Sequence, residues 1–402
     1  MAQAYLPNDY PNSIFSTFSF LGFLVCMVPL PWHLEAWNAG MCMFMIWTGL
    51  GCLLLFVNSL VWHHNAINWS PVWCDIAVRY IVGLNIATPA TCLCITRRLY
   101  HITAIRIPAS KLDNRRAILV DVAIGMGMPI LGMVLQYIPQ GHRFNIFEDV
   151  GCWPYTYNTI VGLALVSVPP AVICLVSGVY AVLSLRSFWK SRGQFDEVLS
   201  SMGHRNLTPS RYVRLLCFSS LGVVITFMGA MFSLGMNVHF HLVKPWTGWM
   251  DTHEDFQRVD QYPAIIWRSR SDLVVALEGS RWCIVGSAFL FLVFFGFVDG
   301  AVKKYRSALQ TVSTNIGLSS STSTELLTTS SGAGVKVPPF PAVEVAVPEH
   351  VLDISPIRSQ SQSSIAMTNS HLSIPSSPTR ISNVFPAIAM TPLGRTNTYQ
   401  IV

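Results

Sequence analysis

Seven stretches of this sequence are each long and apolar enough to cross a lipid bilayer as a helix, and no other feature restricts the fold as strongly. A hydrocarbon core about 30 Å thick requires roughly 20 predominantly apolar residues in a helix. Of the 402 residues, 51% are hydrophobic and only 11% are charged, whereas a soluble domain typically has about 25% charged residues. The sequence therefore predicts an all-α membrane protein, a seven-transmembrane helix bundle. Its spans are expected near residues 12–31, 39–61, 73–96, 117–138, 158–183, 213–236 and 280–299.

The composition changes sharply after Tyr305. The remaining chain is rich in Ser and Thr, with a Pro-rich segment, VPPFPAVEVAVP, between two such runs. A segment of this kind has too little apolar surface to fold by itself. We therefore predict two parts, a seven-transmembrane domain over residues 1–302 and a disordered Ser/Thr/Pro-rich cytoplasmic tail over residues 303–402.

The distribution of Lys and Arg between the short loops predicts the orientation in the membrane. Basic residues concentrate after the third, fifth and seventh windows, whereas the segment before the first window and the second loop, WHHNAINWSP, contain none. Because basic loops stay in the cytoplasm, the N-terminus is expected to be extracellular and the tail cytoplasmic. The first window continues to spanning length without a basic region before it, so we expect an uncleaved signal anchor.

Charged residues inside the predicted spans are costly and need a partner or a wet cavity. Arg79 lies about two turns inside the third span, and Asp75 and Glu278 are its candidate partners. Alternatively, the Arg79 side chain reaches outward to the lipid headgroups. Asp121 and Asp299 lie near the cytoplasmic ends of the fourth and seventh spans, where solvation or pairing with nearby basic residues is expected.

The ten cysteines show no metal-binding spacing, and most lie inside apolar windows. Cys74 and Cys152 differ, because the predicted topology places both on the oxidising side of the membrane, where disulfides persist. We expect these two to pair, with Cys283 as the competing partner. A Cys74–Cys152 bridge would hold the loop before the fifth span over the helix bundle.

Signatures of enzymes are missing from the sequence, including GxSxG, HExxH and the Walker A pattern. The pairs His63-His64 and His239-x-His241 resemble ligands of membrane iron sites, but they fall in predicted outer loops rather than on facing helices. We therefore predict a protein that is not an enzyme, with no cofactor, no metal and no nucleic-acid partner. A transporter or channel for a small solute remains the alternative function.

Several short stretches carry a resemblance to a known family. They are PWH at 31–33, WCDI at 73–76, LCITRRLY at 93–100, QGHRFNIFEDVGCWP at 140–154 and RYVRLL at 211–216. With these stretches the chain resembles the fungal lipopeptide (a-factor-type) mating-pheromone receptors, of the fungal class of G-protein-coupled receptors and of basidiomycete style. The resemblance covers roughly residues 10–306. The chain departs from the family's pattern at two places, Gly300-Ala301 and a first inner loop without a basic residue. These departures weaken any exact G-protein contact assigned to those positions.

The resemblance implies a plasma-membrane receptor for a farnesylated peptide mating pheromone. Such a receptor activates a heterotrimeric G protein and the mating MAP-kinase pathway, and its ligand also partitions into membrane lipids. The residues expected near the mouth of the ligand site are Arg79, Arg143, Phe144, Glu148, Glu278 and Arg281. Those expected around the G-protein cavity are Arg97, Arg98, Arg186, Lys190, Arg211 and Arg214.

Overall fold

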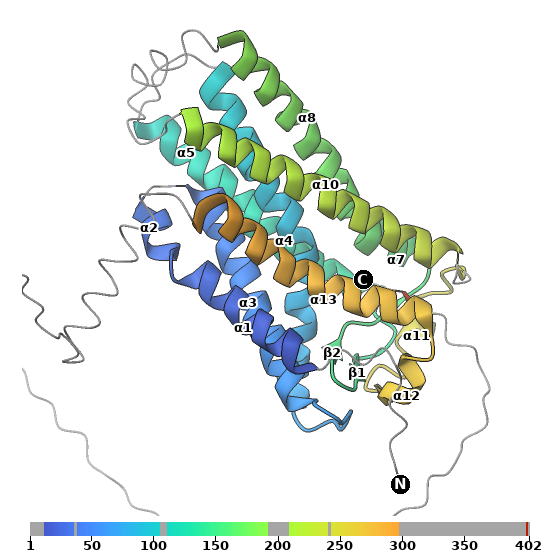
Figure 1. The fold of residues 1–402 in the computed structure, drawn as a ribbon. Coiled ribbons are helices and arrows are strands. Elements are labelled where there is room, and N and C mark those ends of the chain that lie inside the picture. Colours follow the sequence, from blue (N-terminus) through green and yellow to red (C-terminus); the bar gives the residue numbers. More distant parts are fainter. Residues whose placement is uncertain are drawn as a thin grey trace, which may run out of the picture. The chain divides into compact units, whose positions relative to one another are not determined.

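The computed structural model describes residues 12–35, 38–104, 111–191, 209–239, 243–296 and 399–400. Within them, seven helical segments are long and apolar enough to cross a membrane, which confirms the predicted number (Figure 1). They are Asn12–Leu34, Ala39–Val61, Pro71–Thr103, Arg115–Gln136, Ile160–Lys190, Ser210–His239 and Ser271–Gly296. The protein is therefore a multi-pass membrane protein. The predicted tail, its boundary at residue 302 and Asp299 lie outside the described residues, apart from residues 399–400.

The spans are built from helices that are partly subdivided. The first span contains α1 (Asn12–Met27) and α2 (Leu30–Glu35), the second is α3 (Ala39–Val61), and the third is α4 (Pro71–Ala104). The fourth joins α5 (Lys111–Val122), η1 (Ala123–Gly127) and α6 (Met128–Gln136), and the fifth joins α7 (Ile160–Gly162), η2 (Leu163–Ser167) and α8 (Val168–Ser191). The sixth is α10 (Pro209–His239), and the seventh joins α13 (Ser271–Phe291) and η4 (Leu292–Gly296).

The seventh span begins nine residues earlier than its predicted window. Asp272, Glu278 and Arg281 interrupt the apolar pattern there, so hydropathy alone placed the start of the helix too late. In the structure Glu278 and Arg281 form an ion pair at 2.6 Å within α13. Cys283 consequently lies in the middle of α13, not at its outer end as expected.

Three segments with π-helical hydrogen bonding, η1, η2 and η4, widen the fourth, fifth and seventh spans. Pro129 and the pair Pro169-Pro170 follow η1 and η2 after one intervening residue each. A proline ring clashes with the carbonyl four residues earlier, and a wider π turn relieves that contact. The carbonyl oxygen of Gly125 in η1 instead accepts a hydrogen bond from Trp47 Nε1 at 3.1 Å.

The third span lies at the centre of the bundle, since α4 has the largest buried share of the seven. Small residues on α4, including Ala77, Ala87 and Ala90, are fully buried and allow the neighbouring helices to approach closely. In contrast, α6 and α8 expose large apolar side chains such as Val134 and Val179. Such residues suit contact with lipid tails.

A small sheet covers one end of the bundle, which is called the sheet end below (Figure 1). Strand β1 (Phe144–Phe147) pairs antiparallel with β2 (Gly151–Trp153) and parallel with β4 (Val259–Tyr262). The short helices α11 (Trp249–Thr252) and α12 (Ala264–Trp267) flank β4 in the loop before α13. This sheet was not predicted from the sequence, because its strands are short and lie between long apolar windows.

Two further short strands form a second pair. β3 (Thr156–Tyr157) pairs antiparallel with β5 (Tyr399–Gln400). β3 lies at the sheet end, whereas the seventh span ends at the opposite end of the bundle.

Candidate functional site

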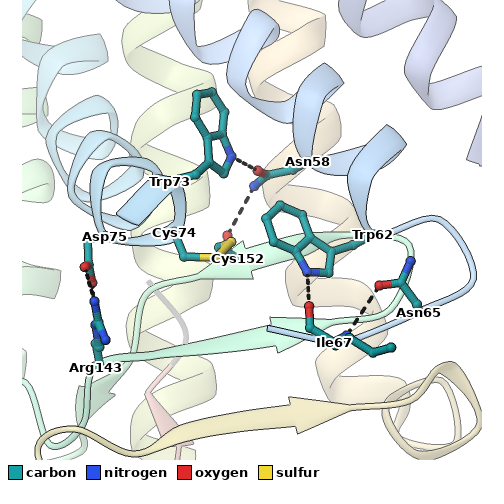
Figure 2. Close-up of a disulfide and its surroundings, with 9 residues drawn as sticks. All are labelled: Asn58, Trp62, Asn65, Ile67, Trp73, Cys74, Asp75, Arg143 and Cys152. Carbon is teal, nitrogen blue, oxygen red and sulfur yellow. Dashed lines mark hydrogen bonds and ion pairs between the residues drawn. A yellow bond between two sulfur atoms is a disulfide. The ribbon is translucent and has the colours of Figure 1, made fainter. Parts of the chain in front are cut away.

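A disulfide attaches the sheet to the third span. Cys152 of β2 is bonded to Cys74 near the start of α4, with a Cα–Cα distance of 5.3 Å. This is the pair that the sequence favoured, while Cys283 is a free and exposed thiol. Figure 2 shows the bridge beside Asn58, whose amide donates to the Cys152 carbonyl oxygen at 3.5 Å and accepts from Trp73 Nε1 at 2.8 Å. The loop before the fifth span is thereby held against spans two and three.

Gly151 explains why the chain can pass so close to the second span at this point. Its φ is +87°, a conformation that residues with a side chain rarely adopt. A Cβ atom at Gly151 would lie 2.7 Å from the Cβ of Asn58 and 3.0 Å from the Trp62 ring. The glycine before Cys152 is therefore required for both the turn and the contact that orient the disulfide.

Asp149 lies in the turn between β1 and β2 and connects three parts of the sheet end. Its carboxylate, 5% exposed, accepts from the backbone N–H of His64 and from Arg268, both at 3.0 Å. Its carbonyl oxygen accepts from Arg281 Nη1 at 3.1 Å, while Arg281 also binds Glu278. The turn after span two, the loop before α13 and span seven are thus joined through one residue.

His63, His64 and Asp149 present ligand atoms within 4.8 Å of one another. The carboxylate of Asp149 already accepts hydrogen bonds from Arg268 and the His64 backbone. The arginine charge beside it opposes a divalent cation. The group is better described as a hydrogen-bonded junction than as a metal centre.

Arg79 does not pair with either carboxylate proposed from the sequence. Its guanidinium donates to the side-chain oxygens of Gln136 and Gln140 and lies 5.5 Å from the centre of the Tyr137 ring. Asp75, its neighbour one turn away, instead binds Arg143 Nε at 2.8 Å. The predicted pairing of Arg79 was wrong because only carboxylates were considered as partners. The actual partners are two side-chain amides, one at the end of the fourth span and one in the turn that follows it.

The other predicted ligand residues also support the sheet. Phe144 is fully buried in β1, and Glu148 accepts the backbone N–H of Ala264 at 2.6 Å and, through its carbonyl oxygen, the Trp267 indole N–H at 3.2 Å. Hydrogen bonding to Asp75 raises the pKa of Arg143 above its usual value. All six predicted residues are grouped at or near the sheet end, and none of them lines the cavity described next.

A cavity of about 690 Å³ lies among spans two, three, five, six and seven, below β2. Its walls are mainly apolar, with side chains such as Leu84, Val166, Phe232 and Ile284. The size falls in the range of roughly 300–1,000 Å³ that small-molecule sites occupy. The cavity can therefore hold an apolar group of substantial size inside the membrane domain.

Two polar residues stand out in the wall of this cavity, Trp153 and Asn85. Trp153 of β2 is only 4% exposed, and its indole N–H is buried without an acceptor. Asn85 lies 14 residues after Pro71 on α4, roughly 21 Å along the helix, and its side chain is exposed to the cavity. Neither residue was predicted from the sequence. WCDI and GCWP drew attention to the disulfide, but no local pattern marks the walls of a cavity.

The opposite end of the bundle, called the basic end below, contains a buried carboxylate. Asp121 has an exposed side-chain fraction of 1% and binds Arg97 Nη2 at 2.7 Å, with Arg98 Nη1 at 3.9 Å. This confirms the expected pairing with basic residues, but not solvation of Asp121. One Asp121 oxygen and Arg97 Nε remain buried without a hydrogen bond to a described residue.

The remaining basic residues predicted at this end are more open. Arg186, Lys190 and Arg211 are exposed, and Arg214 donates to Ser210 within α10 at 3.1 Å. Arg97 and Arg98, in contrast, are mostly covered by the bundle. The structure thus separates the six residues into a half-buried pair on α4 and a more exposed set on α8 and α10.

Comparisons with known proteins agree with this architecture. The family model described as "Pheromone A receptor" matches residues 14–314, which covers six spans fully and the first from its third residue, and the chain belongs to that family. The chain is 43% identical over 330 residues to "Pheromone B alpha 3 receptor" of Schizophyllum commune, covering 82% of this chain and 52% of that protein. It is 33% identical over 292 residues to "Pheromone receptor 1" of Mycosarcoma maydis, covering 72% and 82% respectively.

A more distant relative is "Pheromone a factor receptor" of Saccharomyces cerevisiae, 22% identical over 300 residues, with 73% of this chain and 60% of that protein covered. The chain spans about half the length of the Schizophyllum commune relatives that it matches. The search of solved structures found no match. The resemblance to fungal pheromone receptors is confirmed, and the family is one of receptors rather than enzymes.

Proposed function

We propose that this protein is a plasma-membrane receptor for a farnesylated peptide pheromone and that it activates a heterotrimeric G protein and the mating MAP-kinase pathway. The observation that carries the proposal is the apolar cavity below the disulfide-linked sheet, in a chain of the pheromone A receptor family. An apolar cavity suits an isoprenyl chain, because each CH₂ that is buried there contributes about 0.8 kcal/mol to binding relative to water.

The sheet end is the extracellular end in this proposal. A disulfide forms and persists on the oxidising side of the membrane, and Cys74 and Cys152 are joined at the sheet end. The basic residues of α8 and α10 gather at the other end, as expected for cytoplasmic loops. Both observations support an extracellular N-terminus and a cytoplasmic tail.

Activation would proceed by population shift. A ligand favours the active bundle only to the extent that it binds that conformation more tightly than the resting one. The cavity contacts α10 and α13, and α10 continues to the basic end, where Arg211 and Arg214 lie. A ligand that changes the packing of α10 would therefore change the surface offered to the G protein.

The alternative function, a transporter or channel, needs a polar path through both leaflets. The charged groups instead form ion pairs near the two ends, and the cavity walls between them are mainly apolar. No observation on the described residues favours transport.

The test is expression in a fungal cell whose own pheromone receptor has been deleted and whose mating pathway drives a reporter. Farnesylated peptides of varied sequence, and the same peptides without the farnesyl group, are applied to cells with receptor shown at the surface. We expect a response to at least one farnesylated peptide and a much weaker response to its unmodified form. Silence towards every prenylated peptide, with receptor at the surface, would contradict the proposal.

A further inference from the structure

The geometry points to a lateral portal: we infer that the apolar chain of the ligand passes from the bilayer between α10 and α13 into the cavity below β2. There, the indole N–H of Trp153 donates to the first hydrogen-bond acceptor next to that chain. This inference rests on the proposed function, since it takes an isoprenylated peptide as the ligand. It adds the route, the depth and a polar contact.

The direct route from the extracellular side is closed by the sheet. Every residue of β1 and β2 is buried, and the sheet is attached to three spans. The attachments are the Cys74–Cys152 bridge to span three, the Asn58 hydrogen bond to span two and the Arg281 hydrogen bond to span seven. An apolar chain that entered through the sheet would have to break several of these contacts.

The wall between α10 and α13 is open in contrast. Cavity-lining residues on α13 recur every four positions, at Val275, Gly279 and Cys283, and all three are exposed although they line the cavity. Positions four apart lie on one face of a helix, so this face of α13 borders both the cavity and the bilayer. The facing residues of α10 include Gly229 and Phe232, which are exposed as well.

Two glycines leave room on the facing sides of these helices. A Cβ atom at Gly229 or at Gly279 would meet nothing within 4 Å, so no neighbouring side chain fills the space at these positions. An isoprenyl peptide dissolved in the outer leaflet reaches this opening without leaving the membrane, because the prenyl chain already concentrates the peptide there.

The polar contact follows from Trp153. A buried indole N–H without an acceptor costs about 1–3 kcal/mol, so the site gains when a ligand brings a carbonyl or ester oxygen. Asn85 offers a second hydrogen-bonding group deeper in the same cavity. The ligand class is therefore a long apolar chain with a hydrogen-bond acceptor close to the point where the chain joins the peptide.

The first experiment narrows the portal. Gly279→Phe places a ring in the opening, and Gly286→Phe is the matched control. Gly286 lies on the same helix, is exposed and is equally free of neighbouring atoms, but it does not line the cavity. In a reporter cell, Gly279→Phe is expected to slow association of an active farnesylated peptide about tenfold or more, and Gly286→Phe to leave it unchanged. Trp153→Phe is expected to weaken binding about three- to tenfold.

A second measurement uses the wild-type receptor, so it does not depend on folding of a variant. A peptide with a diazirine at the far end of its isoprenyl chain is bound and photolysed, and the labelled residues are located by mass spectrometry. Label on α10 and α13 between residues 224 and 287, removed by excess unlabelled pheromone, is the expected result. Label on the outer faces of α6 or α8, or label that the pheromone does not displace, would overturn the portal.

The outcomes separate the portal from the proposed function. If wild type responds and Gly279→Phe associates as fast as wild type, the portal is refuted and the receptor function stands. If wild type answers no prenylated peptide at all, both the function and the portal that rests on it are refuted.

Discussion

Removal of the Cys74–Cys152 bridge tests how far the sheet depends on its covalent attachment. The bridge closes a segment with a sequence separation of 78, and the chain-entropy relation gives about 4.5 kcal/mol for a loop of that length. Membrane insertion already restricts the enclosed spans, so we expect the lower, typical loss of about 2–4 kcal/mol. With about 2–4 °C per kcal/mol, the melting temperature should fall by roughly 5–15 °C.

The assay is thermal unfolding of purified receptor in detergent, followed by loss of the monodisperse chromatographic peak. The Cys74→Ala/Cys152→Ala variant is compared with Cys283→Ser, which removes a free thiol and should melt within about 1 °C of wild type. Reduction of wild type should reproduce the effect of the double variant. Equal melting temperatures for wild type and the double variant would refute the claim that the bridge stabilises the sheet end.

Three further predictions concern the ends of the bundle. In a nucleotide-exchange assay, Arg214→Ala should weaken G-protein activation by about fivefold, roughly 1 kcal/mol, with the surface level and pheromone binding unchanged. An equal loss of surface level would show that Arg214 only sets the topology. Asp121→Leu should lower the stability of the receptor by about 3–5 kcal/mol, because it leaves Arg97 largely buried without its carboxylate partner. Adding Arg97→Met should recover part of that loss. A double variant less stable than Asp121→Leu would contradict the pairing. Burial lowers the pKa of His142, which faces Asn145, Asp260 and Arg258. The unfolded chain therefore takes up a proton more readily, and stability should fall as pH drops below about 6.5. Between about pH 7.5 and 5, the melting temperature should change less with pH for His142→Gln than for wild type.

Long apolar windows and the positions of the basic loops predicted the seven spans, because the bilayer restricts length and composition so strongly. The predicted start of the seventh span was too late. Glu278 and Arg281 form an ion pair inside the helix, whereas a hydropathy sum counts each charge as a separate unfavourable contribution. The pairing of Cys74 with Cys152 could be favoured from topology alone, as the two lie on the same side of the membrane.

The interior of the candidate site could not be predicted in the same way. The ligand residues predicted from the sequence were mostly charged, such as Arg143 and Glu148, and the structure places these two in the contacts that hold the sheet. The cavity walls are ordinary apolar and small residues whose role depends on how five spans pack. Trp153 becomes conspicuous only when its buried indole N–H is seen without an acceptor among the described residues, and Asn85 only when the cavity that it lines is seen.

The most direct test of the account is a measurement of pheromone binding after the cavity has been filled. Ala230 lines the cavity on α10, whereas its neighbour Met231 is exposed and does not. Ala230→Trp should weaken binding of an active farnesylated peptide by about 30-fold or more, that is by at least about 2 kcal/mol, and Met231→Trp should leave it within about threefold. Equal affinity in both variants, with both at the surface, would contradict the claim that the cavity holds the ligand's apolar chain.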